Sequence, residues 1–257
     1  MDDRLQITFL GTGTSQGIPI IGNTHPVCLS EDQKDKRLRV SVLVQWKEFN
    51  YVIDCGPDFR QQLLTNPIER LDGILFTHEH ADHTAGLDDI RPFFFRQGDI
   101  DLYADERVIA SLHKRFYYFF AEKRYPGVPK VIIKNISKNE IINLNGLLVE
   151  PIEVMHNKLP ILGFKIQDFV YLTDVKTIAP DQLKKIKNVK VLVVNALREK
   201  PHESHLNLEE ALKFANDVGA ETTYFTHISH LLGFHSEVEA NLPKGVHLAY
   251  DNLKITV

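Results

Sequence analysis

The first eighty residues carry short apolar runs separated by glycine or polar breaks, which is the pattern of β-strands. We expect strands at four of these runs, residues 7–10, 40–46, 51–54 and 74–77. The last run ends directly on His78. Asp105 can then cap a helix that extends through about residue 121, because five apolar side chains recur after it at helical spacing: Val108, Leu112, Phe116, Phe119 and Phe120.

The second half of the chain repeats this alternation of strands and helices. Strands are expected at four runs, residues 149–154, 163–173, 189–194 and 222–226, the second of them folded at 167–168. A short helix is expected over residues 182–187. Asn207 caps a longer helix that carries Glu210 at its third position and ends at Gly219.

Strands followed by helices, twice over, indicate two sheets that pack face to face with helices on the outside. We therefore predict an α+β fold, a four-layer αββα sandwich, that forms one domain over residues 1–257. A chain of 257 residues is long enough to bury the core that such a domain needs.

Composition and charge narrow the function classes. The chain is 43% hydrophobic and 25% charged, with a formal net charge of −4, so it lacks the basic excess of a nucleic-acid-binding protein. Its two cysteines, Cys28 and Cys55, argue against a disulfide framework and favour a reducing, cytoplasmic location. No apolar stretch at the beginning of the sequence suits a signal peptide or membrane span, so we expect no membrane partner.

The twelve histidines are unusual, and several of them cluster. Residues 77–83 read THEHADH and place four candidate metal ligands within six positions: His78, His80, Asp82 and His83. A loop at the end of a strand can turn such side chains toward one point, as a regular strand or helix cannot. Imidazole and carboxylate suit zinc, manganese or iron, and we expect the four ligands to be divided between two neighbouring ions.

Three further ligand-type residues directly follow or lie close behind predicted strands: His156, Asp174 and His227. A single histidine at a strand end is ordinarily a hydrogen-bonded polar residue, so each of these is weak evidence alone. Together with residues 77–83 they predict a cleft at one edge of the sandwich.

The segment 77–83 matches the His-x-His-x-Asp-His signature of the metallo-β-lactamase superfamily, and the resemblance covers nearly the whole chain. Within that superfamily the chain is similar to the phosphoribosyl 1,2-cyclic phosphate phosphodiesterases of phosphonate degradation, which are close to the tRNA 3′-processing endonucleases. Three stretches carry the narrower similarity: residues 11–19, 56–60 and 226–230.

The resemblance implies a set of roles for these residues. His78, His80 and His156 would hold a first metal ion, and Asp82, His83 and His227 a second, with zinc or manganese as the candidate metals. Asp174 would bridge the two ions together with a hydroxide, and Asp54 would orient a ligand histidine. Asp82 is counted among the catalytic residues as well as the ligands.

The resemblance also suggests a general acid. His205 lies just before the helix capped by Asn207, where a histidine of the phosphodiesterase branch points into the cleft. His202 is the competing candidate, and the spacing from Asn207 favours His205. Both could instead be exposed loop residues.

One departure concerns a structural zinc ion that relatives bind through three cysteines and a histidine. Here Asn23 and His25 replace the first two cysteines, while Cys28 and His230 remain. Asparagine is a poor zinc ligand. Either His25, Cys28 and His230 hold an additional zinc ion, or the loop keeps its shape by hydrogen bonds without metal.

Two other signals are weaker. The glycines of residues 11–17 suggest a phosphate loop, but no helix follows them, so a turn beside the metal cleft is expected. The aromatic and basic stretches 91–96 and 115–120 could stack nucleic-acid bases. Helical spacing of their phenylalanines favours core packing or a homodimer contact.

The sequence therefore predicts an enzyme, a metal-dependent hydrolase that acts on a small, cyclic or open phosphate diester. The nearest alternative is a tRNA 3′-processing endonuclease, against which stand the acidic charge and the lack of a long basic insertion. A β-lactamase, a thioester hydrolase and a non-catalytic scaffold with the same fold are further alternatives.

Overall fold

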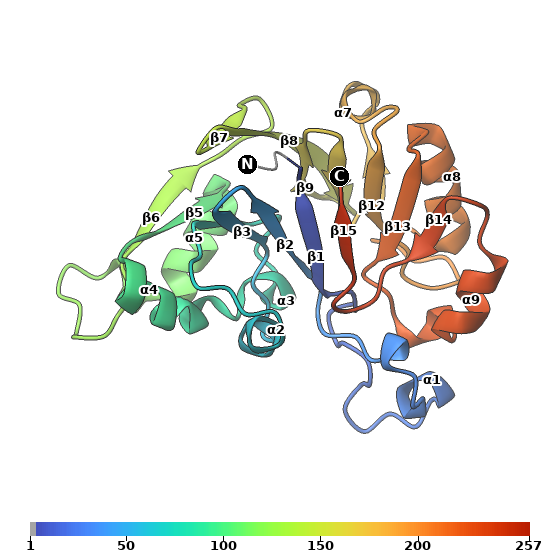
Figure 1. Ribbon diagram of the computed structural model, residues 1–257, viewed down its shortest axis with the longest axis horizontal. Coiled ribbons are helices and arrows are strands. Elements are labelled where there is room, and N and C mark those ends of the chain that lie inside the picture. The colour runs from blue at the N-terminus through green and yellow to red at the C-terminus, as the bar shows by residue number, and fades with distance from the viewer. Residues whose placement is uncertain (1–3) are drawn as a thin grey trace.

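The computed structural model describes residues 4–257; residues 1–3, on which the expectation of no leader segment partly rests, lie outside it. Two mixed sheets face each other (Figure 1). The first has the order β15 (Lys254–Thr256), β1 (Gln6–Gly11), β2 (Ser41–Trp46), β3 (Phe49–Ile53), β4 (Gly73–Leu75), β5 (Ile100–Ala104) and β6 (Val131–Asn135). The second has the order β11 (Thr177–Ile178), β8 (Leu147–His156), β9 (Leu159–Ile166), β10 (Phe169–Tyr171), β12 (Val191–Asn195), β13 (Thr222–Thr226) and β14 (Val246–Leu248), and β7 (Ile142–Leu144) pairs with β8.

Helices cover the outer faces of both sheets. Those in the first half of the chain are α2 (Phe59–Thr65), α3 (Ala81–Thr84), α4 (Arg91–Gln97), α5 (Glu106–Arg115) and α6 (Tyr117–Phe120). Those in the second half are α7 (Pro180–Lys185), α8 (Leu208–Val218) and α9 (His235–Asn241). The short α1 (Pro26–Leu29) lies in the long loop between β1 and β2. The 3-10 turns are η1 (Gln33–Asp35), η2 (Leu87–Ile90) and η3 (His230–Leu232). No helix within residues 4–257 is long and apolar enough to cross a membrane.

The alternation of side chains along each strand builds a layered core. Val42 and Val44 of β2 face the core between the sheets, where they join Phe164 of the second sheet. Leu43, between them, faces the opposite side and packs with the core under the helices of the first sheet. A third core lies between the second sheet and its helices. The predicted αββα sandwich is therefore confirmed, with the two inner layers formed by sheets.

Most predicted elements are present, with changes at their ends. The helix after Asp105 is capped as predicted, since the Asp105 side chain accepts a hydrogen bond from the Val108 amide. It breaks at Phe116, however, so that α5 and α6 replace one helix over residues 105–121. Phe116 and Phe119 both lie in the outer core, which confirms core packing for those two phenylalanines.

The helix after Asn207 follows the prediction closely. Asn207 and Glu210 form a reciprocal capping box, and Gly219 ends the helix in the left-handed conformation at φ 72°. The strands β5, β6 and β14 were not predicted. Each pairs in parallel with a strand distant in sequence, and their short runs carry little periodic signal of their own.

Candidate metal centre

The ligand loop, residues 77–83, joins β4 to α3 and contains the four clustered ligand candidates. His78 and His83 are fully buried, whereas His80 is exposed at the N-cap of α3. β4 ends at Leu75 and α3 begins at Ala81, so the four side chains do not follow the periodicity of a single strand or helix. This turn allows them to approach one region from different sides.

The second sheet supplies three more candidates from separate strand ends. His156 is the last residue of β8, Asp174 follows β10, and His227 directly follows β13. Asp174 and His227 both have positive φ values, 57° and 53°, as does Asp54 at 62° in the first half. A left-handed backbone costs a non-glycine residue about 1–2 kcal/mol, so its occurrence at three positions around one cluster indicates a functional constraint.

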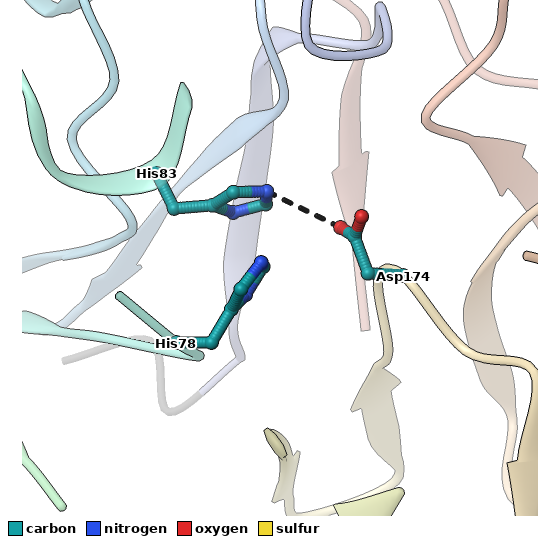
Figure 2. A group of neighbouring side chains, drawn as sticks. All are labelled: His78, His83 and Asp174. Atoms are coloured by element: carbon teal, nitrogen blue, oxygen red, sulfur yellow. Dashed lines mark ion pairs between the residues drawn. The ribbon is translucent and has the colours of Figure 1, made fainter. Parts of the chain in front are cut away.

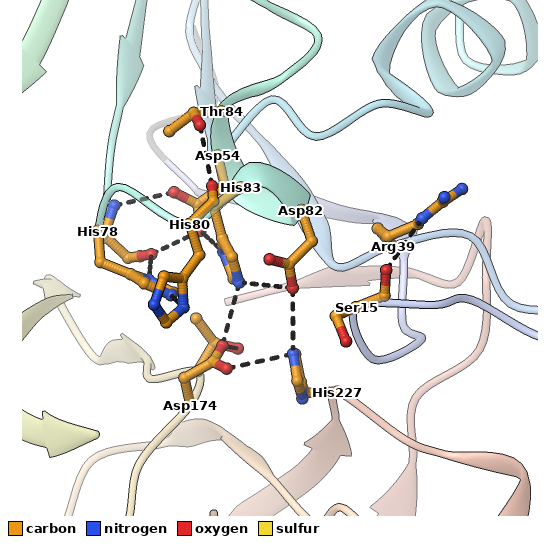
Figure 3. Close-up of polar contacts among 12 residues, drawn as sticks. Ser15, Arg39, Asp54, His78, His80, Asp82, His83, Thr84, Asp174 and His227 are labelled. Atoms are coloured by element: carbon orange, nitrogen blue, oxygen red, sulfur yellow. Dashed lines mark hydrogen bonds and ion pairs between the residues drawn. The ribbon is translucent and has the colours of Figure 1, made fainter. Parts of the chain in front are cut away.

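The carboxylate of Asp174 lies at the centre of the cluster (Figures 2 and 3). Its Oδ2 is 3.2 Å from Nε2 of His83, and its Oδ1 is 3.2 Å from Nε2 of His227. Asp82 approaches the same two rings, with its Oδ2 3.3 Å from Nε2 of His83 and 3.8 Å from Nε2 of His227. Three compact ligand groups result: His78–His83–Asp174, Asp82–His83–His227 and His156–Asp174–His205.

His80 completes the side of the cluster that faces His156. Its Nδ1 is 3.0 Å from Nε2 of His78, and its ring centroid is 5.3 Å from that of His156. The structure thus brings together all seven residues that the resemblance implies as ligands, from both sheets.

Hydrogen bonds fix the orientation of the rings. Nδ1 of His83 donates to Asp54 at 2.7 Å, and Asp54 also accepts bonds of 2.8 Å from the amide and the hydroxyl of Thr77. Nδ1 of His78 lies 2.9 Å from the Thr77 hydroxyl, and Nδ1 of His156 lies 3.0 Å from the carbonyl oxygens of Asp174 and Ser204. Nε2 is then the nitrogen left for a metal ion, which is the usual arrangement in metal centres.

Several buried nitrogen atoms in the cluster have no hydrogen-bond partner among the described residues. They are Nε2 of His83, both ring nitrogens of His227 and Nδ1 of His205. An unpaired buried polar group costs about 1–3 kcal/mol, so such atoms gathered in one place indicate a ligand-binding site. Neutral imidazoles with two carboxylates form a donor set that suits divalent zinc or manganese, so the residues present fit the metal ions that the fold implies.

The charges around the cluster favour the ligand forms of His78 and Asp174. Burial, together with the neighbouring His83, lowers the pKa of His78 well below its usual range, so that its ring is neutral. Burial alone would raise the pKa of Asp174, but the adjacent His227 and His83 outweigh it and hold that pKa well below the usual range. An ionised carboxylate beside a neutral imidazole is the combination that a divalent cation requires.

Of the two candidate acids, His205 is the one inside the cluster. Its ring is buried and lies 4.8 Å from that of His227 and 4.6 Å from that of His156, and its Nδ1 is 3.5 Å from Asp174. His202 lies on the outer side of His205, with its ring centroid 5.0 Å from that of His205. The position agrees with the preference for His205, and burial lowers the pKa of its ring to about 3.

The loop that would hold a structural zinc ion is tied by hydrogen bonds. Nδ1 of His25 accepts from the Val27 amide and so caps α1, while Oδ1 of Asn23 accepts from the His25 amide. Nδ2 of Asn23 lies 3.5 Å from Nε2 of His230. Within residues 4–257, the groups of three candidate ligands with donor atoms within 4.8 Å include neither His25, Cys28 nor His230. The additional zinc ion stays a prediction.

The glycine-containing segment 11–17 lies beside the cluster, because Thr12 and Thr14 exchange backbone hydrogen bonds with Ile228, and no helix directly follows it. The carbonyl of Ser15 in this segment accepts a 3.3 Å bond from Arg39 Nε (Figure 3). Arg39 is itself paired with Asp58 at 2.8 Å. Two other contacts were not predicted. The Thr77 hydroxyl lies between Asp54 and His78, and the guanidinium of Arg107 pairs with Glu79 of the ligand loop.

Comparison with known proteins agrees with this geometry. The sequence pattern of the beta-lactamase superfamily domain matches residues 49–228. A crystal structure of a diphosphatase from the PhnP family is similar, with a TM-score of 0.93 and 39% identity over 99% of this chain and 97% of that chain. An octanoyltransferase of Porphyromonas gingivalis is 38% identical over 98% of this chain and 52% of its own length. A ribonuclease Z of Bradyrhizobium diazoefficiens is 28% identical over 63% of this chain and 49% of its own. The chain thus spans about half the length of these curated relatives.

Proposed function

The chain belongs to the beta-lactamase superfamily, and from this premise we propose that it is a metal-dependent hydrolase that cleaves a small phosphate diester, cyclic or open, at a dinuclear centre. The similarity to a PhnP-family diphosphatase over nearly the whole chain supports a phosphate substrate. The observation that carries the proposal is the central carboxylate of Asp174, which lies 3.2 Å from one histidine of each sheet.

In this proposal His78, His80 and His156 would hold the first ion, Asp82, His83 and His227 would hold the second, and Asp174 would be a ligand of both. When bound, such a pair of divalent ions lowers the pKa of water toward neutrality and stabilises charge on the phosphate oxygens. The chain's own part is to hold these ligands rigidly, and the bonds from Asp54 and Thr77 to the ligand loop serve that purpose.

We assign to His205 the proton for the leaving oxygen. An alkoxide is a poor leaving group until it is protonated, and a positioned acid contributes roughly 10²–10⁴-fold. Burial keeps the His205 ring neutral in the free chain, where its pKa is lowered to about 3. The negative charge of a bound phosphate diester beside the ring would favour the protonated form.

A tRNA 3′-processing activity is the second candidate, because a ribonuclease Z is among the relatives. The net charge of −4 argues against a firm grip on tRNA. The octanoyltransferase relative favours no transferase activity here, since the chain matches only 52% of it and the histidine–aspartate cluster suits hydrolysis.

The test is a turnover screen of protein loaded with zinc or manganese. The substrates are bis(p-nitrophenyl) phosphate, cyclic nucleotides, phosphoribosyl cyclic phosphate and a tRNA precursor, and Asp174→Asn serves as the inactive variant with Asp181→Asn as its surface control. We expect turnover of a small diester that Asp174→Asn abolishes and Asp181→Asn preserves. Full metal loading without turnover of any diester would refute the proposal, and cleavage of the tRNA precursor alone would establish the second candidate.

A further inference from the structure

Arg107 joins the ligand loop to the second sheet. It is the second residue of α5, on the side of the first sheet. Its Nε lies 3.1 Å from Oε1 and 3.2 Å from Oε2 of Glu79, and its Nη2 donates to the carbonyl oxygen of Pro160. A weaker contact of 3.4 Å joins the same Nη2 to Asp105. One guanidinium therefore touches groups from three segments of the chain.

The two main partners of Arg107 lie next to the proposed ligands of the first ion. Glu79 stands between His78 and His80 in sequence. Pro160 is the second residue of β9, and in the β8–β9 hairpin it lies opposite Met155, the neighbour of His156. The contact thus connects the loop that carries two of these ligands with the hairpin that carries the third.

A second arginine provides a useful contrast. Arg115, at the end of α5, donates to the carbonyl oxygen of Glu79 at 3.3 Å and to the hydroxyl of Thr84 at 2.5 Å. Both partners belong to the ligand loop and α3, so Arg115 steadies this loop from the first-sheet side. Arg107 differs because its Nη2 reaches across to Pro160 of the second sheet.

A planar guanidinium suits this task. Its donors point in fixed directions, so that binding a carboxylate through Nε and a carbonyl through Nη2 sets the distance between them. A metal site loses affinity when its ligands depart by more than about 0.5 Å from the required geometry. We propose that Arg107 is a positioning residue that holds His156 at the distance from His78 and His80 that the first ion requires.

This inference rests on the proposed function only for the identity of the first ion's ligands, and its test measures metal binding. Cobalt(II) affinity is determined stepwise by competition with a chelator and by the visible absorption of each step. We expect Arg107→Ala and Glu79→Gln each to weaken one of the two cobalt-binding steps. For Arg107→Ala the affinity of that step should fall by roughly 10–100-fold, while the affinity of the other step stays unchanged. Arg107→Lys should restore part of the loss, because an ammonium keeps the charge but reaches only one partner.

Arg91→Ala is the matched control. Arg91 has a similar side-chain exposure, 27% against 34% for Arg107, and pairs with Asp88 at 2.8 Å. It should leave both cobalt steps unchanged. Arg115→Ala removes a contact to the ligand loop from the first-sheet side alone. It should weaken the cobalt-binding step less than Arg107→Ala does.

A double-mutant cycle identifies the ion concerned. The loss caused by Arg107→Ala should vanish when His156→Ala has already disabled the first position, and should persist in a His227→Ala background. Equal weakening of both steps, or full persistence of the loss in His156→Ala, would overturn the inference. Because cobalt binding is measured without substrate, failure to find a phosphate diester that is hydrolysed would leave this result intact.

Discussion

The carboxylate of Asp54 lies 2.7 Å from Nδ1 of His83, and both side chains are fully buried. Asp54 also binds the amide and the hydroxyl of Thr77, so that one carboxylate fixes both ends of the ligand loop. Burial raises the pKa of Asp54, and the nearby His83 opposes this shift. The bond to Nδ1 leaves Nε2 of His83 directed toward Asp82 and Asp174.

Asp54→Asn should therefore weaken binding of the second ion. The amide keeps the shape of the carboxylate but removes the charge that orients the His83 ring, and loss of such a partner costs roughly 10–100-fold in metal affinity. Isothermal titration with zinc checks this. Asp72→Asn is the control, since the Asp72 side chain is only 2% exposed and accepts a 2.9 Å bond from the Asn50 amide. Equal zinc affinities of Asp54→Asn and the unmodified protein would contradict the orienting role.

Substitution of His205 should affect substrates according to their leaving groups. If His205 protonates the leaving oxygen, His205→Ala should lower kcat by roughly 10²–10⁴-fold for an alkyl diester. The loss should be small for p-nitrophenyl esters, whose leaving group needs no proton. His202→Ala, one layer farther from the cluster, should show no such contrast. An equal loss for both kinds of ester in His205→Ala would assign His205 to binding instead.

Stability should depend on His235 between about pH 4 and 6.5. Its Nδ1 lies 3.1 Å from Nη2 of the buried Arg37. Burial, with the cations of Arg37 and Lys34, lowers the pKa of His235 from 6.5 to about 4, and Glu239 and Asp32 oppose the shift.

Between these two pH values the unfolded chain binds the proton and the folded chain does not, so the free energy of unfolding falls as the pH drops. The contribution of His235 is on the order of 3 kcal/mol.

Burial gives Asp251 the opposite behaviour, since it raises the pKa of that carboxyl to about 6. The comparison with His235→Gln isolates the histidine, because glutamine can still accept the bond from Arg37. Denaturant unfolding at several pH values checks this. As the pH drops, the free energy of unfolding should fall less steeply for His235→Gln and more steeply for Asp251→Asn than for the unmodified protein. Parallel curves for His235→Gln and the unmodified protein would contradict the assignment.

Gly56 should tolerate no side chain. A Cβ atom there would lie 2.0 Å from the backbone oxygen of Asp82, and backbone cannot move aside as a flexible side chain can. Gly56→Ala should displace the ligand loop, lower the free energy of unfolding by about 1–3 kcal/mol and weaken metal binding. Gly22→Ala is the comparison, because its Cβ would meet nothing within 4 Å and only its φ of 73° is unfavourable. It should lose stability without loss of zinc affinity.

The parts that the sequence predicted well are those with local causes. Asn207, Glu210 and Gly219 define α8 through caps that involve residues a few positions apart. The four-ligand loop is likewise recognisable because its residues are adjacent. His156, Asp174 and His227 were found because each lies at or just beyond the end of an apolar run, which a sheet edge brings together.

The parts that were missed depend on distant partners. β5 and β6 extend a parallel sheet, and the short apolar runs at residues 100–104 and 131–135 do not by themselves show which strands they join. Arg107 likewise acts between Glu79 and Pro160, which stand 81 positions apart in sequence. The break of the 105–121 helix at Phe116 was missed as well, because the phenylalanines keep their helical spacing across it.

The most direct measurement of the central claim is an anomalous difference map, recorded at the zinc absorption edge, from crystals of the zinc-loaded protein. We predict two neighbouring peaks, one within bonding distance of His78, His80 and His156 and the other of Asp82, His83 and His227, with Asp174 reaching both. A fully zinc-loaded crystal with a single peak in the cluster, or with its peaks elsewhere, would contradict the dinuclear centre.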